Sequence, residues 1–406
     1  MFISLTFGLA IFYPFFVETN TLTSLNVGIL VLILGTNGAL EFLTLAKYRV
    51  LLSADQKTYV ISLASIVHII TNTFIVVVLG TMQVNIVILR LVALLSIFLR
   101  SFILMLYVRT KYKYINYNEK PNTEALNKRW DALYLQILGA VHNGAPVVIL
   151  TLVTRDLMLV SVYTIFNMVS ASLNGILSIF KSGLSASFGD VIAKGENKVL
   201  QKSYSEFEFS YYALITAVYS IAFITIMPFI RIYTSGVTDI NYKVPLIGFM
   251  FVLNGLLYNL KTPQGMLVIS AGMFRETKVQ TTIQGIIAIV LGLVLAPLIG
   301  IYGVLLASIF SNIYRDIDLL FFIPRNLTKL PVIDTAKRMF RVGISVVMIC
   351  IPFVYIEISA NGYLEWVFNA ILVGIYACTV IVIMSLLFDR VAFKESYNRV
   401  VRMVKR

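Results

Sequence analysis

Two basic side chains lie deep inside apolar stretches of the chain. Arg100 and Lys261 each have no acidic residue within their own stretch to neutralise them. A charge in apolar surroundings is costly, so it usually faces a polar cavity or a partner. Arginine offers a fork of donors to phosphate oxygens, and lysine offers a compact positive charge. These two residues therefore predict a site for an anionic group.

Polar residues also form stripes along two of the apolar stretches. Intervals of three or four residues place the members of a stripe on one face of a helix. The first stripe contains Tyr163, Asn167, Ser170 and Asn174, and the second contains Asn254, Tyr258 and Lys261. Such stripes either line a cavity or join helices by hydrogen bonds, and the sequence leaves both interpretations open.

Three charged residues, Glu41, Arg315 and Asp316, are candidates for coupling transport to an ion. Arg315 and Asp316 share a helix face with Asn312, and an ion pair of Arg315 with Asp316 or Asp318 is the simplest interpretation of this cluster. Glu41, inside another apolar stretch, is a candidate coupling carboxylate. The alternative interpretation is that Glu41 lies at the cytoplasmic interface of the membrane, close to Lys47.

The elements that position these residues are membrane helices. Hydrophobic residues make up 59% of the 406 residues and charged residues 13%, which is far from the balance of a soluble domain. A crossing needs about 20 apolar residues, and on this measure about twelve spans are expected. They are 1–17, 25–46, 59–80, 86–108, 133–154, 159–180, 209–233, 244–269, 279–299, 302–323, 342–360 and 366–388.

Most of the positive charge lies in alternate connectors between these spans. Only Arg155, Arg231 and Lys243 fall in connectors on the opposite side. The positive-inside rule assigns the basic side, and with it both termini, to the cytoplasm. The net charge of +13 is scattered over short connectors, which argues against nucleic-acid binding. The basic tail, 389–406, is expected to lie as an amphipathic helix on anionic lipids.

Cofactor and metal chemistry are not expected. The two cysteines, Cys350 and Cys378, lie in the last two predicted spans, and the two histidines, His68 and His142, lie in different helices. The sequence has no phosphate-binding loop, dinucleotide fingerprint or nucleophile elbow. ATP-driven transport by the chain itself is therefore disfavoured, and an enzyme is not predicted. Energy for transport would come from an ion gradient, the membrane potential or the gradient of the substrate.

The chain repeats itself. AIFYPFF at 10–16 and ITIMPFI at 224–230 each precede a span with a central Asn-Gly pair, at Asn37-Gly38 and Asn254-Gly255. Parallel halves of this kind are typical of transporters. In the second copy a helix pair precedes the matching segment, so the first copy is expected to lack its first pair. The alternative is a natural twelve-helix chain with an imperfect repeat.

Three stretches resemble a known family. KYRVLLSADQKTYVIS at 47–62, the segment 160–196 and PQGMLVISAGMFRETKVQ at 263–280, together with the spacing of Pro228, are similar to bacterial polysaccharide flippases, the Wzx-type oligosaccharide translocases. These belong to the multidrug/oligosaccharidyl-lipid/polysaccharide exporter superfamily. The resemblance implies an all-α, two-lobed, inverted-V transporter in the bacterial cytoplasmic membrane. Its parts would be an N-terminal lobe (1–130), a C-terminal lobe (131–330), two additional helices (331–388) and the tail.

The resemblance also implies a substrate and a mechanism. Such proteins flip polyprenyl-pyrophosphate-linked oligosaccharides by alternating access, with the head group in a central cavity, and a polysaccharide polymerase and other assembly proteins are expected partners. Prolines 14, 146, 228 and 263 could serve as hinges. The predicted pyrophosphate contacts are Arg90, Arg100 and Lys261, and the predicted sugar contacts are Tyr163, Asn167, Asn174, Asn254 and Tyr258.

Two other functions remain as alternatives. A multidrug or cation antiporter of the same superfamily would need acidic residues in its cavity, whereas these helices carry more basic ones. A polysaccharide polymerase would be expected to have a large outer loop or an acidic catalytic motif. The sequence leaves the exported polymer open, whether capsule, O-antigen, teichoic acid or exopolysaccharide.

Overall fold

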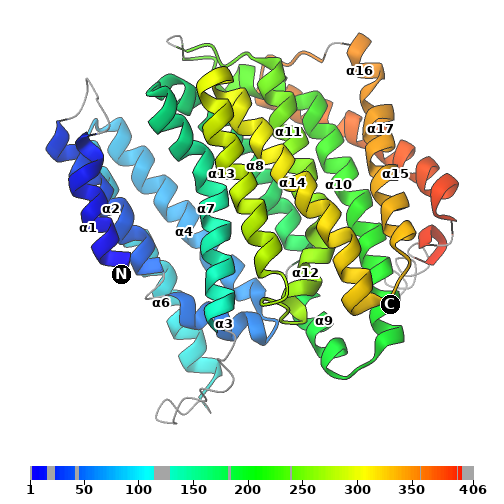
Figure 1. The fold of residues 1–406 in the computed structure, drawn as a ribbon. Coiled ribbons are helices and arrows are strands. Elements are labelled where there is room, and N and C mark those ends of the chain that lie inside the picture. Colours follow the sequence, from blue (N-terminus) through cyan, green and yellow to red (C-terminus); the bar gives the residue numbers. More distant parts are fainter. Residues whose placement is uncertain are drawn as a thin grey trace. The chain divides into compact units, whose positions relative to one another are not determined.

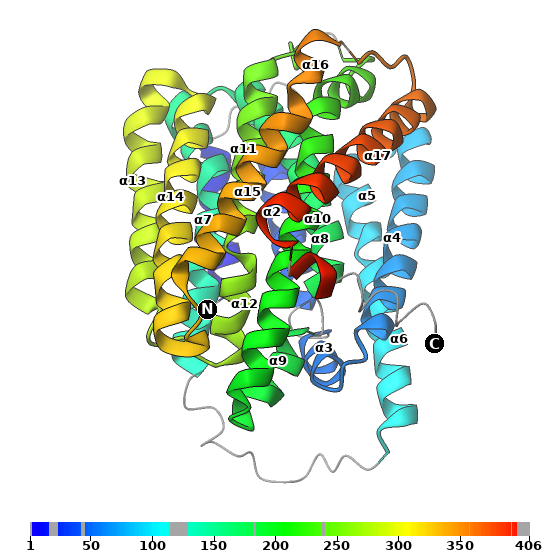
Figure 2. The same cartoon turned by 90° about the vertical axis from the view of Figure 1, so that its right-hand side faces the viewer.

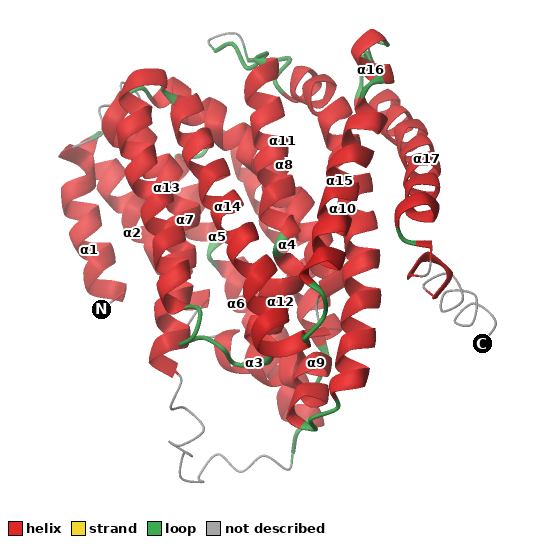
Figure 3. Cartoon of the chain, turned by 45° about the vertical axis from the view of Figure 1, so that its right-hand side comes forward, coloured by secondary structure: helices red, strands yellow, loops and turns green. Residues whose placement is uncertain are grey.

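The protein is built from α-helices. The computed structural model describes residues 2–15, 23–41, 45–113, 129–181, 184–237, 240–356, 358–390 and 392–395. Across these residues the elements are helices joined by turns, with no strand (Figures 1 and 3). The expected all-α class is confirmed.

Eight helical segments in the described part of the chain are long and apolar enough to cross a membrane. They are 58–81, 86–111, 130–154, 157–181, 197–233, 278–299, 332–355 and 363–388. Large apolar side chains such as Phe74, Leu298 and Leu387 are exposed on their outer surfaces, as expected for helices that face lipid. The chain is therefore a multi-pass membrane protein.

The other predicted spans differ from these eight for identifiable reasons. The first two predicted spans form shorter helices, α1 (Phe2–Phe12) and α2 (Ser24–Leu40). The span predicted at 244–269 is two helices, α11 (Pro245–Leu260) and α12 (Thr262–Ser270). The span predicted at 302–323 is α14 (Ile301–Ile323), which is long enough but carries Arg315, Asp316 and Asp318.

The structure divides into two compact units, 1–121 and 122–406. The first continues from α2 with α3 (Ala46–Ala54), α4 (Thr58–Thr81), α5 (Ile86–Ala93) and α6 (Leu95–Lys111), and a short turn, η1 (Tyr13–Phe15), follows α1. Its main core packs Leu45, Leu52, Ala64 and Leu104, none of which is exposed to solvent. The predicted span 86–108 is interrupted at Leu94, whose N–H bonds to the carbonyl of Leu91 in a tighter turn.

The second unit holds the remaining helices. They are α7 (Arg129–Thr154), α8 (Leu157–Lys181), α9 (Leu184–Ala193), α10 (Asn197–Tyr233), α11, α12, α13 (Lys278–Ile299), α14, the turn η4 (Pro324–Thr328), α15 (Val332–Cys350), α16 (Pro352–Tyr355) and α17 (Tyr363–Phe388). The long helix α10 supplies the core residues Tyr211, Tyr212 and Tyr219, which are almost completely buried. Both α15 and α17 pack against α10 (Figure 2).

Two predicted boundaries were wrong in the second unit. Helix α10 begins at Asn197, well before the predicted start at 209, because its polar first turns still pack on their neighbours through Leu200 and Tyr204. Helix α15 covers Val332–Cys350 rather than 342–360, and Pro352 begins the separate short helix α16. Most of the basic tail lies outside the described residues.

Close contact between α13 and α14 depends on glycine. The turn between them uses Gly300 with φ of 57°, a left-handed conformation that glycine adopts readily. A Cβ atom on Gly303 would lie 2.5 Å from the backbone carbonyl of Leu295. The absence of a side chain at Gly303 therefore lets these two helices approach closely.

Candidate functional site: a cationic cavity in the second unit

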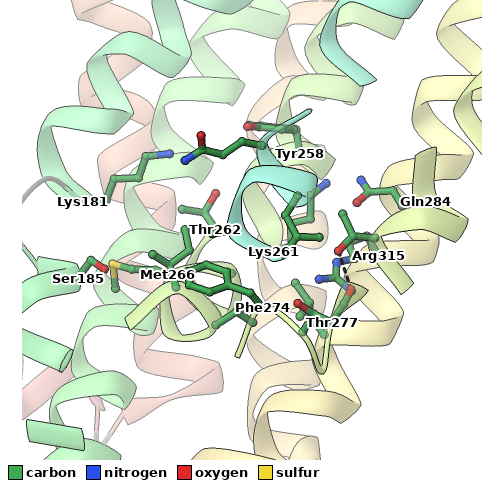
Figure 4. A pocket seen from close by; sticks show the side chains of 18 residues that line it. Lys181, Ser185, Tyr258, Lys261, Thr262, Met266, Phe274, Thr277, Gln284 and Arg315 are labelled. Carbon is green, nitrogen blue, oxygen red and sulfur yellow. Dashed lines mark hydrogen bonds between the residues drawn. The ribbon is translucent and has the colours of Figure 1, made fainter. Parts of the chain in front are cut away.

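A cavity of about 560 Å³ opens between the helices of the second unit (Figure 4). Helices α7, α8, α9, α11, α12, α13 and α14 all contribute to its walls. Its polar lining residues are Gln136, Lys181, Ser185, Tyr258, Lys261, Thr262, Thr277, Thr281, Gln284 and Arg315. The cavity is therefore assembled from segments far apart in the sequence.

Three cations line this cavity. Lys181 ends α8, Lys261 lies between α11 and α12, and Arg315 belongs to α14. In Figure 4 Lys181 enters from one side, and Lys261 and Arg315 lie on the other. No aspartate or glutamate is among the lining residues. The carboxylates of Asp316 and Asp318 lie behind the lining, beside Lys261 and Arg315, and the three cations leave a net positive charge that can attract an anion.

The helix break places Lys261 at the cavity. Pro263 lacks a backbone N–H and disfavours the helical conformation of the residue before it. Helix α11 therefore ends at Leu260, and Pro263 lies in the first turn of α12, where proline is well tolerated. Lys261 caps both helices at this junction.

The Lys261 ammonium is held by neighbours from α11 and α14. It donates a hydrogen bond to Oδ1 of Asn312, and it lies 4.9 Å from the centre of the Tyr258 ring, within cation–π distance. Asn312 in turn donates to Oδ1 of Asn254 at 2.8 Å. Asp316 is close enough to interact electrostatically with Lys261.

The acidic residues of α14 have separate roles. Arg315 forms an ion pair with Asp318 at 2.5 Å, which confirms the predicted local pair and selects Asp318 as the partner. Asp316 is 7% exposed, and its two carboxylate oxygens have no hydrogen-bond partner among the described residues. Throughout the described residues, no group of three or more His, Cys, Asp or Glu side chains could hold a metal ion.

Most of the predicted sugar contacts lie away from the cavity lining. Tyr163 is 5% exposed and packs in the core against Phe251, with ring centres 4.9 Å apart. Asn167 is exposed on α8. Asn174 and Asn254 accept hydrogen bonds from neighbouring helices. Of the five predicted sugar contacts, only Tyr258 lines the cavity. Asn174 and Asn254 instead join helices by hydrogen bonds, which was one of the two interpretations of the polar stripes.

The centre of this hydrogen-bonded network is Asn259, which the sequence analysis did not identify. Its side-chain amide donates to Asn174 and to the hydroxyl of Tyr219, both at 2.7 Å. Its carbonyl oxygen accepts from the hydroxyl of Tyr211 at 2.9 Å. Asn259 is 1% exposed, so these bonds join α8, α10 and α11 where water is excluded.

Lys181 was also missed as a site residue. It follows Asn174 by seven residues and so continues the polar stripe of α8 to the end of that helix. This periodicity could have identified it. Gln284 likewise follows Thr277 and Thr281 at helical spacing, and all three line the cavity. Gln136 gave no such signal, because its neighbours at helical spacing, such as Ala132 and Ala140, are apolar.

The predicted unpaired state of Arg100 was wrong. In the first unit its guanidinium lies 3.2 Å from a carboxylate oxygen of Glu41, and the same oxygen lies 3.3 Å from Arg49. The neutralising carboxylate belongs to another segment of the chain, so the spacing of residues along the helix of Arg100 gave no sign of it. Arg90 lies exposed on α5.

The fold defines the class of this chain as an α-helical, multi-pass membrane protein. Comparison with protein-family models and with curated protein sequences gives no match. Among solved structures, the chain is similar to the lipid II flippase MurJ in an inward closed conformation. The identity is 17%, the TM-score is 0.60, and the match covers 96% of this chain and 81% of the other.

Proposed function

We propose that this protein flips a lipid-linked oligosaccharide, with a pyrophosphate group, across the membrane. The observation that carries the proposal is the cavity with three cations and no lining carboxylate. A fold similar to that of a solved lipid II flippase supports it. A pyrophosphate must leave water to cross the bilayer, and fixed cations in the cavity would replace part of its hydration.

The proposed pyrophosphate site consists of Lys181, Lys261 and Arg315. Lysine ammonium groups bind phosphate oxygens as point charges, and the arginine fork adds directional hydrogen bonds. Arg315 would share its charge between Asp318 and the substrate. Because Arg100 is already paired with Glu41, it becomes a weaker candidate for substrate contact, and Arg90 stays a prediction.

Neutral groups of the same cavity suit the sugar. The ring of Tyr258 offers an apolar face for a sugar ring, and Gln136, Thr262 and Gln284 offer hydrogen bonds to hydroxyl groups. Asn167 stays a predicted sugar contact. We assign Tyr163, Asn174 and Asn254 a positioning role, since they hold α8 and α11 in place.

Transport would proceed by alternating access, with the basic connectors and both termini on the cytoplasmic side of a bacterial membrane. Asp316 is the proposed coupling group. It is buried beside Lys261 without a hydrogen-bond partner among the described residues, so a change in its charge would alter the field at the cation. Specificity for one oligosaccharide repeat and contact with a polymerase belong to this proposal as well.

A flipping assay in proteoliposomes tests the proposal, with a polyprenyl-pyrophosphate oligosaccharide as substrate. A charge-assisted hydrogen bond contributes about 1.5–3 kcal/mol, so Lys261→Ala should reduce the transport rate by roughly 10- to 100-fold. Lys181→Ala should also reduce it. The control is Lys243→Ala, a cation exposed in a connector outside the cavity, which should transport normally.

Two outcomes would overturn the proposal. If Lys261→Ala and Lys243→Ala behave alike while lipid is still flipped, the cavity is not the pyrophosphate site. If the unmodified protein moves no pyrophosphate lipid but drives efflux of an organic cation from the same vesicles, the antiporter is the correct function. The buried carboxylate of Asp316 makes that second assay worthwhile.

A further inference from the structure

A second polar cavity, of about 200 Å³, lies at the end of α17 that leads into the basic tail. Its lining residues are Asp334, Lys337, Arg338 and Arg341 of α15, with Phe388 and Asp389 at the end of α17. It shares no residue with the cationic cavity. The proposed flipping function therefore does not account for it.

One of its arginines is fully engaged by the protein. Arg338 donates to Glu208 at 2.8 Å and to Asp389 at 2.9 Å. It also donates to the backbone carbonyl and the hydroxyl of Ser205. Its guanidinium thus has acceptors in three directions, and two carboxylates lie against its single positive charge.

The neighbouring arginine has no such acceptors. Arg341 is 4% exposed, and its guanidinium carbon lies 4.5 Å from the centre of the Phe209 ring. Both terminal nitrogens are buried, and no described residue accepts a hydrogen bond from them. Asp389 and Glu208 are close enough to interact electrostatically with Arg341, but its donors stay unsatisfied, and leaving a buried donor without an acceptor costs free energy, more so for a charged group. An acceptor from outside the protein would remove this cost.

We propose that this cavity binds a phosphate-type oxyanion, with Arg341 as its principal ligand. The guanidinium fork would donate to two of the oxygens. Lys337 is exposed beside Arg341 on the same helix and would add a second positive charge. Asp389 is engaged by Arg338, and Asp334 is exposed in the first turn of α15.

The size and position of the cavity suit the head group of an anionic lipid. Its 200 Å³ corresponds to roughly seven water molecules at about 30 Å³ each, enough for one phosphodiester. Arg390 and Lys394 are exposed just beyond it. The positive-inside rule predicts that this end faces the cytoplasmic leaflet, where anionic lipids are concentrated and basic pockets between helices bind them. Inorganic phosphate offers the same oxyanion from solution.

Thermal unfolding of the full-length protein distinguishes the two sources. Nanodiscs of phosphatidylcholine are compared with nanodiscs in which part of it is replaced by phosphatidylglycerol. Detergent samples are compared in phosphate and in chloride at equal ionic strength. Ligand binding to the folded state should raise Tm by on the order of 2–4 °C. Native mass spectrometry then counts the phosphatidylglycerol molecules retained.

The variants are Arg341→Gln, Arg341→Lys and the control Arg275→Gln, whose arginine is exposed and lies outside this cavity. Arg341→Gln should lose most of the Tm increase and one retained lipid, Arg341→Lys should keep part of both, and Arg275→Gln should keep both. An Arg341-dependent increase in phosphate but not with phosphatidylglycerol would assign the site to a soluble anion.

The proposal fails if neither phosphatidylglycerol nor phosphate raises Tm in a way that depends on Arg341. Water alone would then satisfy the guanidinium. If Arg341→Gln does not fold, Arg341→Lys is compared with the unmodified protein instead. Equal Tm increases and equal numbers of retained lipids in these two proteins would contradict the proposed role of the Arg341 guanidinium. Normal flipping by Arg341→Gln would leave the inference intact, because the two sites are separate.

Discussion

The two units of this protein treat charge inside their helices in different ways. In the first unit, Glu41 of another segment neutralises Arg100. In the second unit, Lys181 and Lys261 reach a cavity whose lining contains no carboxylate, and the acidic residue nearest Lys261, Asp316, forms no hydrogen bond with it. A cation in an apolar helix is thus not evidence of a binding site by itself. The acidic residues that other helices bring to it decide whether its charge is available to a ligand.

The second unit also encloses its polar groups more completely. Glu208 is 1% exposed and receives hydrogen bonds from Tyr204, Thr335 and Arg338. This network connects α10 with α15. The ion pairs of the first unit are more open, and the side chain of Glu41 is 44% exposed. Removing one partner should therefore have unequal consequences in the two units.

The largest expected difference concerns two ion-paired arginines, Arg338 in the second unit and Arg100 in the first. Arg338→Met should lower the free energy of unfolding by about 3–5 kcal/mol, because it leaves the carboxylate of Glu208 buried without its counter-ion. Arg100→Met should cost at most about 1 kcal/mol, since Glu41 is partly hydrated and keeps Arg49. Equilibrium unfolding in detergent micelles measures both. Equal losses would contradict the contrast between the units.

A second difference concerns helix packing. Gly303→Ala should destabilise the second unit by about 1–3 kcal/mol, because the new Cβ would meet the backbone of Leu295, which cannot rotate away. In the first unit, a Cβ at Gly35 would lie 2.0 Å from Cγ2 and 3.0 Å from Cβ of Thr6. A change of rotamer relieves the first contact but not the second, so Gly35→Ala should cost less than Gly303→Ala but still destabilise the first unit. Gly343→Ala is the control, with nothing within 4 Å of its Cβ. A similar Tm for Gly303→Ala and Gly343→Ala would show that the two helices can separate freely.

A smaller effect is expected from two tyrosine hydroxyls. Tyr219→Phe removes the partner of Asn259 and Asn174 inside the second unit, and should cost about 1 kcal/mol. Tyr59→Phe removes the 3.1 Å contact with Tyr107 at the surface of the first unit and should leave the unfolding midpoint unchanged. Denaturant titrations of the two variants sharpen the comparison. A larger loss of stability in Tyr59→Phe than in Tyr219→Phe would contradict the contrast between the two units.

The smallest expected effect is a pH dependence at the surface of the first unit. Hydrogen bonds from Lys57 and then Tyr112 lower the pKa of Asp55 below its ordinary value of 3.8. Because the folded state holds this carboxylate ionised, the contact contributes stability above that value and loses it as the pH falls through the lowered pKa. Amide exchange in the turn between α3 and α4, corrected for its intrinsic pH dependence, should quicken below about pH 3.8. Asp55→Asn should exchange faster at neutral pH and show no such transition.

The sequence predicted the helices well, since a long apolar run has few other stable forms in a membrane. The polar stripes gave a mixed result. Spacing along one helix correctly placed Tyr258 and Lys261 together, but it could not tell which neighbouring helix each residue faces. Tyr163 therefore turned out to be a core residue packed on Phe251. Arg100 shows the same limit, because its partner Glu41 is 59 residues away in the chain.

By itself, the sequence determined that this is a helical membrane protein, where its main helices run, and that Lys261 lies two residues before Pro263, which is disfavoured inside a helix. These properties follow from composition and from the local covalent geometry of the backbone. Only the tertiary structure decided which charges are neutralised and which are available. It paired Arg100 with Glu41 and Arg338 with Glu208, and it left Arg341 without an acceptor among the described residues. The reason is physical: the electrostatic energy of a buried charge depends on distances to groups on other helices, and packing alone sets those distances.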